Sequence, residues 1–363
     1  FINNQDVALL PYSSGTTGLP KGVMLTHHNL IIATHAYGPK CIGIGEEAQE
    51  VMVAVYTLCN MGGVFTTLLL GLANGTTLIF YPSFDFETYL AANEKYKCTI
   101  VVAPPPVFVL LAKHPIVDKY NLTSLRMSVM GAAKISKETL EEVQKRIPTM
   151  TIFRQAYGMT ETCGGTFTRK HDIKLGSVGT VPPNLRMKVV DMDTGKDLPS
   201  GRQGEICFQG DQIMKGYLNQ PEATAEIIRN GWLHTGDVGY VDDDGHLYII
   251  DRIKQLIKYK GFQVPPAELE SLLLTHPAIA DAAVIGIPDE LAGELPRAFV
   301  RLKDGHEATE KEIQEFVKSR AVHYKQLRGG VEFVKEIPKN SIGKILHHAL
   351  KDQFKAKNIK SKI

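Results

Sequence analysis

Hydroxyl side chains and glycines crowd the stretch YSSGTTGLPKG at residues 12–22, which also carries a lysine. Glycine allows positive φ, so a loop of this kind can turn several backbone N–H groups toward one point. With the hydroxyl donors and the lysine, the loop would form a cradle for an anion such as polyphosphate. It is not a Walker A loop, which needs four residues between its glycine and a Gly-Lys-Ser/Thr. The candidate cradle residues are Ser13, Ser14, Gly15, Thr16, Thr17, Gly18 and Lys21.

The alternative for this stretch is a flexible polar loop, which is the usual meaning of a Ser/Gly/Thr-rich segment. Its flanks argue against that alternative. The apolar run VALL at residues 7–10 predicts a short buried strand, and apolar positions resume at Val23. Because both ends of the loop are held by apolar elements, we favour a phosphate-binding loop.

A second polar stretch, RQAYGMTETCGG, follows an apolar segment at residues 151–153. A strand that ends near Tyr157 would place Thr160 and Glu161 at the carboxyl edge of a sheet, where open α/β folds bind ligands. The tyrosine could stack on a base, and the carboxylate could hold Mg²⁺. The alternative is a Thr-Glu pair that caps a helix on an ordinary loop.

Three weaker signals lie elsewhere in the chain. Small residues at 131–133 (GAA) follow a buried strand at 125–131, which allows a ligand to approach the backbone or, equally well, a helix to pack tightly. Asp237 in GWLHTGD could hold a ribose diol, although surface turns often carry aspartate. Lys344 in PKNSIGK lies on a Pro/Gly-rich loop that suits the presentation of one charge at a domain interface.

The elements that must position these residues fall into two domains. Strands at 51–56, 77–81 and 99–103, with a helix at 84–97, predict a largely parallel sheet. Short strands separated by turns replace this pattern over 176–250, where Asp244-Gly245 signals a hairpin.

After Asp251 the pattern changes again, to a compact α+β unit with a capping box at Thr309 and Glu312. The predicted fold is therefore an α/β large domain of mixed sheets flanked by helices, with a β-rich subdomain at about 176–250, and a smaller mobile α+β domain. The predicted domains are 1–251 and 252–363, with a hinge near Asp251.

Composition gives few hints of partners. The net charge of +2, with 44% hydrophobic and 22% charged residues, is ordinary for a soluble globular protein and predicts no nucleic-acid surface. Five scattered cysteines without a CxxC pair predict reduced thiols in an intracellular protein, and no Cys/His cluster at ligand spacing indicates zinc. The longest apolar run, at 64–72, is too short to span a bilayer.

The two ends of the chain carry one expectation each. The sequence begins at Phe1 in what reads as domain interior, which we interpret as a fragment. Its last residues, Ser361-Lys362-Ile363, nearly match the Ser-Lys-Leu peroxisomal address. They predict recognition by the peroxisomal import receptor and location in the peroxisome, with the cytoplasm as the alternative.

Taken in order, six motifs give the chain a resemblance to the adenylate-forming superfamily of acyl-CoA synthetases, adenylation domains and beetle luciferases. GELP at 293–296 and LRGGV at 327–331 are similar to insect luciferases and 4-coumarate:CoA ligase-like enzymes. Such proteins extend further at the amino terminus, so the chain resembles a form lacking much of the large domain. The six motifs are residues 12–22, YGMTE at 157–161, GYLNQPEAT at 216–224, GWLHTGD at 231–237, DRIKQLIKYKGFQVPPAELE at 251–270, and PKNSIGK at 338–344.

The resemblance implies a two-step reaction. A carboxylate attacks the α-phosphate of MgATP to give an acyl-adenylate and pyrophosphate, and coenzyme A then displaces AMP. Both steps need charge neutralisation and in-line placement more than covalent catalysis by the protein. The implied substrate is a carboxylic acid of fatty or aryl-propenoic type. The alternatives are an oxygen-dependent luciferase and a truncated nucleotide-binding pseudoenzyme.

The resemblance also implies roles for individual residues. The small domain would first supply Lys344, which bridges the carboxylate and the α-phosphate, and would then rotate about Asp251 for the thioester step. The cradle residues would hold the β- and γ-phosphates, Thr160 the α-phosphate and Glu161 the metal. The remaining implied contacts are Gly131, Ala132, Ala133, Gln155, Ala156, Tyr157 and Gly158 with adenine, Asp237 and Arg252 with ribose, and Lys258, Gly261 and Gln263 in the thioester step.

Departures from the family pattern fall in the implied acyl pocket. Asn60 replaces a histidine, Ala33 replaces the arginine of luciferases, and Gly164 replaces a serine. Together with Gly165, Gly164 predicts more room for a longer or bulkier acyl group. The implied pocket residues are Asn60, Gly164 and Gly165, and the departures at Ala33, Asn60 and Gly164 disfavour light emission.

Overall fold

The computed structural model describes residues 3–13, 20–38, 49–131, 135, 137–169, 172–174, 176–339, 343 and 345–360. Residues 358–360 are described without their side chains. The chain divides into two compact units. Unit 1 comprises Phe1–Thr235 and Gly239–Ile249, and unit 2 comprises Gly236–Val238 and Ile250–Ile363. The hinge role of Asp251 stays a prediction.

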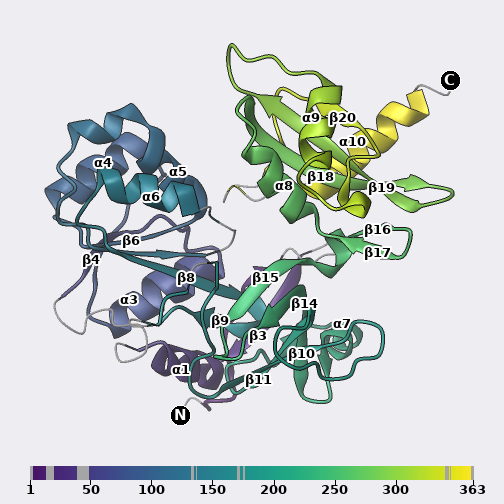
Figure 1. The fold of residues 1–363 in the computed structure, drawn as a ribbon. Coiled ribbons are helices and arrows are strands. Elements are labelled where there is room, and N and C mark those ends of the chain that lie inside the picture. Colours follow the sequence, from purple (N-terminus) through teal and green to yellow (C-terminus); the bar gives the residue numbers. More distant parts are fainter. Residues whose placement is uncertain are drawn as a thin grey trace. The chain divides into compact units, whose positions relative to one another are not determined.

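The central sheet of unit 1 has the strand order β6-β7-β8-β9. Figure 1 labels β6, β8 and β9. The first three strands of the sheet run parallel, as the alternation of strands and helices predicts, whereas β9 turns back antiparallel to β8. The strands are β6 (Ile100–Ala103), β7 (Met127–Met130), β8 (Ile152–Met159) and β9 (Gly164–Phe167). A smaller parallel pair is formed by β4 (Val51–Val53) and β5 (Thr77–Ile79).

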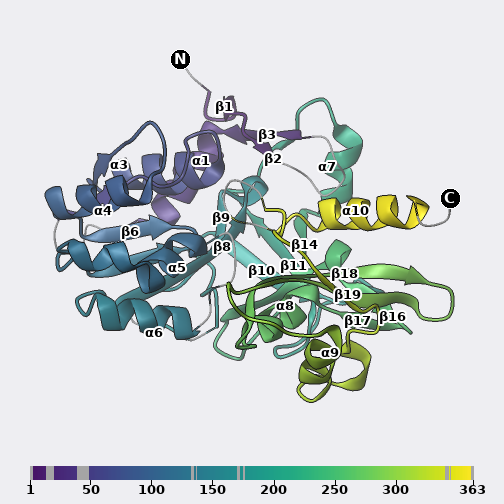
Figure 2. The ribbon, with the colours of Figure 1, turned by 90° about the horizontal axis from the view of Figure 1, so that it is seen from above.

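Helices cover both faces of this sheet, as Figures 1 and 2 show. Along β6, Val101 and Ala103 pack into one core while Ile100 and Val102 pack into the other, because successive side chains of a strand point to opposite faces. A sheet buried on both faces needs such continuous apolar strands. The helices of the first core are α4 (Phe86–Lys95), α5 (Pro105–Lys113) and α6 (Lys137–Arg146), and those of the second are α1 (His27–Ala36) and α3 (Leu70–Ala73).

Two short helical segments connect elements of these layers. A π-helical segment precedes α3, and a 3-10 segment follows α5. They are η1 (Gly62–Leu69) and η2 (Pro115–Lys119).

A separate small sheet forms around β3, in the order β1-β3-β12 with β2 also paired to β3. All of these pairs are antiparallel. The sheet brings together the start of the chain and a segment nearly two hundred positions later. Its strands are β1 (Val7–Leu9), β2 (Tyr12–Ser13), β3 (Lys21–Thr26) and β12 (Gly216–Tyr217).

The predicted β-rich subdomain is a sheet in the order β10-β11-β14-β13, with β15 paired to β14. The pairs β10–β11 and β13–β14 are antiparallel. The hairpin signal at Asp244-Gly245 is confirmed, since Gly245 has φ +84° and donates its N–H to the Asp242 carbonyl in the turn before β15. The elements are β10 (Leu185–Val190), β11 (Gly204–Gly210), α7 (Pro221–Ile227), β13 (Ile228–Arg229), β14 (Trp232–Val241) and β15 (Leu247–Arg252).

Unit 2 is built on a sheet in the order β17-β16-β19-β18, with β20 parallel to β19. The capping box is confirmed: the Thr309 N–H donates to Glu312 Oε2 at 2.7 Å, and the Glu312 N–H donates to Thr309 Oγ1 at 3.3 Å. The strands are β16 (Ile257–Tyr259), β17 (Phe262–Val264), β18 (Ile279–Asp289), β19 (Gly293–Leu302) and β20 (Val331–Phe333). The helical segments are η4 (Ile253–Gln255), α8 (Pro266–Leu274), α9 (Glu310–Lys318), η5 (His323–Lys325) and α10 (His347–Lys360).

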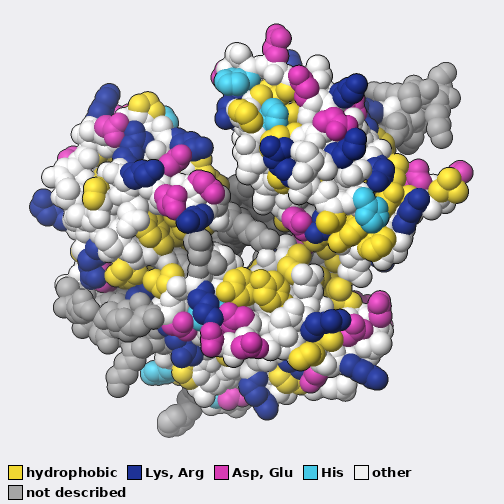
Figure 3. Space-filling model, viewed as in Figure 1, with side chains coloured by type: hydrophobic (Ala, Val, Ile, Leu, Met, Phe, Trp, Pro, Cys, Tyr) yellow, Lys and Arg dark blue, Asp and Glu magenta, His cyan; other side chains and the backbone are white. Residues whose placement is uncertain are grey.

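On the face shown in Figure 3, lysines and arginines are interspersed with aspartates and glutamates. This mixture accords with the net charge of +2. Across the described part of the chain, no helix combines the length and the apolar character needed to cross a membrane.

Candidate active site

The predicted phosphate loop is closed at its base by a strand ladder. Ser13 on β2 pairs with Lys21 on β3, and Tyr12 pairs with Gly22. Ser13 and Lys21, the residues at the two ends of the loop, therefore lie next to each other. Of the predicted cradle, Ser14, Gly15, Thr16, Thr17 and Gly18 lie outside the described residues.

Tyr217 connects the base of this loop to Glu161. Its phenolic O–H donates to Glu161 Oε1 at 2.8 Å, and the Lys21 Nζ lies 4.9 Å from the centre of its ring. The tyrosine is fixed in turn, because β12 pairs with β3 and the Tyr217 N–H donates to Thr224 Oγ1 at 2.9 Å. Two residues predicted from separate stretches thus contact the same side chain. Tyr217 lies in the GYLNQPEAT motif, but its contact with Glu161 is not predicted from the sequence.

Glu161 lies on the short 3-10 segment η3 (Thr160–Thr162), directly after β8. It is only 4% exposed, and a buried carboxylate needs hydrogen-bond donors. Burial and the neighbouring carboxylate raise the pKa of Tyr217, so its hydroxyl remains a donor at neutral pH. Among the described residues, none donates a hydrogen bond to Glu161 Oε2. The carboxylate is therefore a buried acceptor rather than an exposed helix cap, and its role as a metal ligand stays a prediction.

The predicted adenine residues lie on β8 and at the end of β7. The Tyr157 ring packs against Phe208, with the ring centres 6.2 Å apart. The Gln155 N–H donates to Thr168 Oγ1 at 3.1 Å, and the Thr168 N–H donates to the Gln155 carbonyl at 2.9 Å. A Cβ on Gly131 would lie 3.1 Å from the Ala156 carbonyl oxygen. Gly131 thus allows close packing between neighbouring strands, whereas the alternative to a ligand was tight packing of a helix on the strand; contact with a ligand stays a prediction. Ala132 and Ala133 lie outside the described residues.

The predicted extra room at Gly164 and Gly165 is absent. A Cβ on Gly164, where φ is +106°, would lie 2.8 Å from the Tyr37 hydroxyl, and one on Gly165 would lie 2.6 Å from the Tyr157 carbonyl oxygen. Tyr37 donates its hydroxyl to the Gly165 carbonyl at 2.9 Å. These glycines therefore accommodate a tyrosine and a close strand pair, and neighbouring atoms leave no free space at their Cβ positions.

Replacing Gly158 with alanine is expected to destabilise unit 1 by about 1–3 kcal/mol, the usual cost of overpacking. Gly158 pairs with Gly165 between β8 and β9, and a Cβ there would lie 2.5 Å from the backbone carbon of Gly164. Urea unfolding measures the change. The control is Gly22→Ala, whose Cβ would meet only side chains at 3.5 Å. Equal stability of the two variants would contradict the close approach of β8 and β9.

The predicted ribose residues form an ion pair. Arg252 Nε lies 3.1 Å from Asp237 Oδ1, and the aspartate side chain is almost completely buried while the arginine is partly exposed. The arginine neutralises a carboxylate that burial would otherwise penalise. The two residues are therefore neighbours, as a shared role requires, and that role stays a prediction.

The residues predicted for the thioester step lie together on one hairpin. Lys258 on β16 pairs with Gln263 on β17, and the turn between them places Lys260 at φ +47° and Gly261 at φ +82°. All three predicted residues are exposed.

Lys344 lies outside the described residues, but the base of its loop is described. Lys339 and Ile345 form an antiparallel bridge, and the Leu346 N–H donates to the Pro338 carbonyl at 2.9 Å. The loop that carries Lys344 is thus closed by backbone hydrogen bonds.

Asn60 makes local contacts. Its Oδ1 accepts from the Gly63 N–H at 3.0 Å, and its Nδ2 donates to Thr57 Oγ1 at 2.9 Å. A cavity of about 260 Å³ is lined by residues 53–58, which shortly precede Asn60 in the sequence, and by residues 80–85, 88 and 89. None of the three predicted pocket residues lines this cavity, so their role as an acyl pocket stays a prediction.

The structure brings together a group of metal-ligating side chains, although the sequence contains no Cys/His cluster at ligand spacing. The group consists of Glu205, Cys207 and His234. Each residue offers one ligand atom, and the three atoms lie within 4.8 Å of one another. The spacing of these residues in the sequence does not reveal the group, because His234 comes from a different strand than Glu205 and Cys207.

Comparison with known proteins identifies the family. Residues 2–218 match the family described as AMP-binding enzyme. The chain belongs to this family. Residues 268–344 match the AMP-binding enzyme C-terminal domain. The resemblance and the fold class predicted from sequence are thereby confirmed.

Named members of the family are similar over nearly the whole chain. It is 47% identical to 4-coumarate–CoA ligase 1 of Petroselinum crispum, over 96% of this chain and 65% of that protein. It is 46% identical to luciferin 4-monooxygenase of Nipponoluciola cruciata, over 97% of this chain and 64% of that protein. The chain therefore spans somewhat less than two thirds of these relatives.

Solved structures of the family share the fold. ATP-bound MatB from Rhodopseudomonas palustris matches with a TM-score of 0.90 and 29% identity, over 98% of this chain and 69% of MatB. The anthranilate CoA ligase AuaEII, solved with anthranoyl-AMP, matches with a TM-score of 0.86 and 27% identity, over 97% of this chain and 68% of that one.

Proposed function

We propose that the protein is an AMP-forming acid–thiol ligase, which activates a carboxylic acid with ATP and transfers the acyl group to coenzyme A. The observation that carries the proposal is the cluster of Lys21, Tyr217 and Glu161 at the base of the Ser/Gly/Thr-rich loop. A cation, a hydroxyl-rich loop and a buried carboxylate are what a metal–triphosphate complex requires. The CoA ligases among the relatives support the same reaction.

In the first step a substrate carboxylate oxygen would bond to the α-phosphorus of ATP while the bond to the bridging oxygen breaks, and pyrophosphate would leave. Lys21 and the loop would neutralise the β- and γ-phosphates, and Thr160 and Lys344 would stabilise charge on the α-phosphate. In the second step the thiolate of coenzyme A would attack the acyl carbon and expel AMP. Lys258, Gly261 and Gln263, which share one hairpin, would serve that step.

Glu161 would hold a Mg²⁺ ion that accompanies ATP. The donor fits, because magnesium in such sites takes one or two carboxylates together with phosphate oxygens. Tyr217 donates to Oε1 and orients the carboxylate, so Oε2 would be the oxygen available to hold the cation. When bound, the ion would offset the negative charge of the phosphates.

The acid is proposed to be aryl-propenoic or fatty. The relatives named as 4-coumarate–CoA ligases, at 45–47% identity, favour the aryl-propenoic class. We further propose that Ser361-Lys362-Ile363, which lie outside the described residues, direct the protein to the peroxisome through its import receptor.

Pyrophosphate release from MgATP, measured across a panel of fatty and aryl-propenoic acids, tests the proposal. We expect release that depends on the acid, and an acyl-CoA product, detected by mass spectrometry, when coenzyme A is added. The similarity to luciferin 4-monooxygenase makes a luciferase the second candidate, which would emit light with luciferin, ATP and oxygen. ATP binding by calorimetry without pyrophosphate from any acid would instead identify a pseudoenzyme.

A further inference from the structure

The β-rich sheet carries polar side chains on the face opposite its core. Ile206 and Phe208 of β11 pack into a core cluster with Leu185 and Leu247. Since side chains alternate along a strand, Glu205 and Cys207 point to the other face. They lie two residues apart and therefore side by side.

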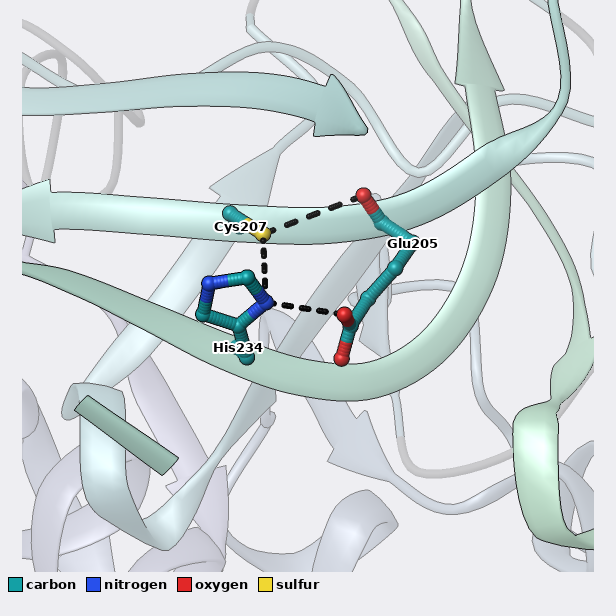
Figure 4. A group of neighbouring side chains, drawn as sticks. All are labelled: Glu205, Cys207 and His234. Carbon is teal, nitrogen blue, oxygen red and sulfur yellow. Dashed lines mark hydrogen bonds and ion pairs between the residues drawn. The ribbon is translucent and has the colours of Figure 1, made fainter. Parts of the chain in front are cut away.

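His234 joins them from the neighbouring strand β14. The two strands are held in place here by a hydrogen bond from Thr235 Oγ1 to the Ile206 carbonyl at 2.8 Å. Figure 4 shows that the imidazole Nδ1 faces both partners. It lies 2.8 Å from Glu205 Oε2 and 3.3 Å from Cys207 Sγ.

These distances are close to those between the ligand atoms of a single ion. Bonds of about 2.0–2.3 Å from zinc to nitrogen, oxygen and sulfur separate neighbouring ligand atoms by roughly 3–4 Å. The three ligand atoms lie within 4.8 Å of one another, so small side-chain movements would admit an ion between them. Cys207 is completely buried and the other two side chains are nearly so, which limits competition from water.

We propose that Glu205, Cys207 and His234 bind one thiophilic divalent cation of the Zn²⁺ class. A sulfur, a nitrogen and a carboxylate oxygen are the donor set that zinc prefers, whereas Mg²⁺ and Ca²⁺ prefer oxygen alone. Three protein ligands leave a fourth tetrahedral position for water. This site is separate from the proposed Mg²⁺ ligand Glu161.

The surrounding charges are compatible with an ion. Arg229 lies 3.8 Å from Glu205 Oε2, but its side chain is 54% exposed and can turn to solvent. Lys188 lies opposite Cys207 in the β10–β11 register and is neutralised by Asp197 at 2.8 Å. A bound thiolate and carboxylate would balance the two charges of the cation.

The competing explanation is a hydrogen-bonded cluster that never binds metal. Burial raises the pKa of the Cys207 thiol to about 12, so the free thiol is protonated at neutral pH and is a poor nucleophile. A cation would have to displace this proton, as metals do when they bind cysteine. Metal titration separates the two explanations.

The test is titration of the purified full chain with Co²⁺, which substitutes for zinc and gives a near-ultraviolet charge-transfer band when bound by a thiolate. We expect one equivalent of Co²⁺ to produce this band and Zn²⁺ to abolish it by displacement. Cys207→Ser should remove the band, and His234→Ala should weaken cobalt binding at least about tenfold. The matched control is Cys59→Ser, because Cys59 is an exposed thiol outside the cluster.

Absence of the band in the wild-type protein would overturn the proposal. So would a band that survives in Cys207→Ser or disappears in Cys59→Ser. Circular dichroism checks that each variant is folded. If a variant is unfolded, the more conservative Glu205→Gln takes its place, and we expect this variant also to bind cobalt at least about tenfold more weakly. Because the readout is metal binding, failure here leaves the proposed ligase activity untouched.

Discussion

Glu161→Gln is expected to slow acid-dependent pyrophosphate release by about 100-fold or more, comparable with the loss of one essential electrostatic contact in other enzymes. The substitution keeps the size of the side chain and an oxygen that can accept from Tyr217, but it removes the charge that would hold Mg²⁺. The expected signature is a higher Mg²⁺ concentration for half-maximal rate. Steady-state rates measured across a magnesium titration give both quantities.

Tyr217→Phe tests whether Tyr217 positions Glu161, the proposed metal ligand. The phenylalanine retains a ring beside Lys21 and loses only the O–H that donates to Glu161 Oε1. We expect an effect of about 10–100-fold, typical of a residue that orients a metal ligand, with the same shift in magnesium dependence. If both variants kept the wild-type magnesium dependence, Glu161 would not be the metal ligand.

Lys344→Ala is expected to abolish adenylation, with a loss of at least about 100-fold, while leaving transfer from a preformed acyl-adenylate to coenzyme A nearly unchanged. The lysine cation is proposed to act only while charge builds on the α-phosphate, so its removal affects the first step selectively. The base of its loop is closed by the Lys339–Ile345 bridge, so truncation of one loop side chain should leave the fold intact. Pyrophosphate release and thioester formation are assayed separately.

Two further lysines serve as controls for this experiment. Lys258→Ala should show the reverse pattern, with adenylation retained and thioester formation reduced, because Lys258 lies on the β16–β17 hairpin. Lys335→Ala removes an exposed lysine of the same unit and should affect neither step. Equal losses in both steps for Lys344→Ala would contradict the division of roles.

Much of the fold could be predicted from sequence because local pattern and tertiary burial agree. The apolar runs at 99–103 and 125–131 become β6 and β7, which are buried on both faces. Thr309 and Glu312 cap their helix as expected, since a capping box depends on residues only three positions apart.

The contacts that assemble the candidate site could not be predicted in this way. Tyr217 reaches Glu161 only because β12 pairs with β3, and no local pattern encodes that pairing. The crowding at Gly164 depends on Tyr37, which comes from a distant helix end. Glycine at this position predicts free space, whereas the Tyr37 side chain fills the volume.

The environment of Trp232 has a practical consequence. It is the one tryptophan of the chain, and the Lys188 Nζ lies 4.6 Å from the centre of its ring, on the sheet that also carries Cys207. Its fluorescence emission therefore reports on a single sheet, whereas circular dichroism averages over every helix. Optical melting curves recorded by both methods would reveal whether this sheet loses its structure in step with the rest of the polypeptide.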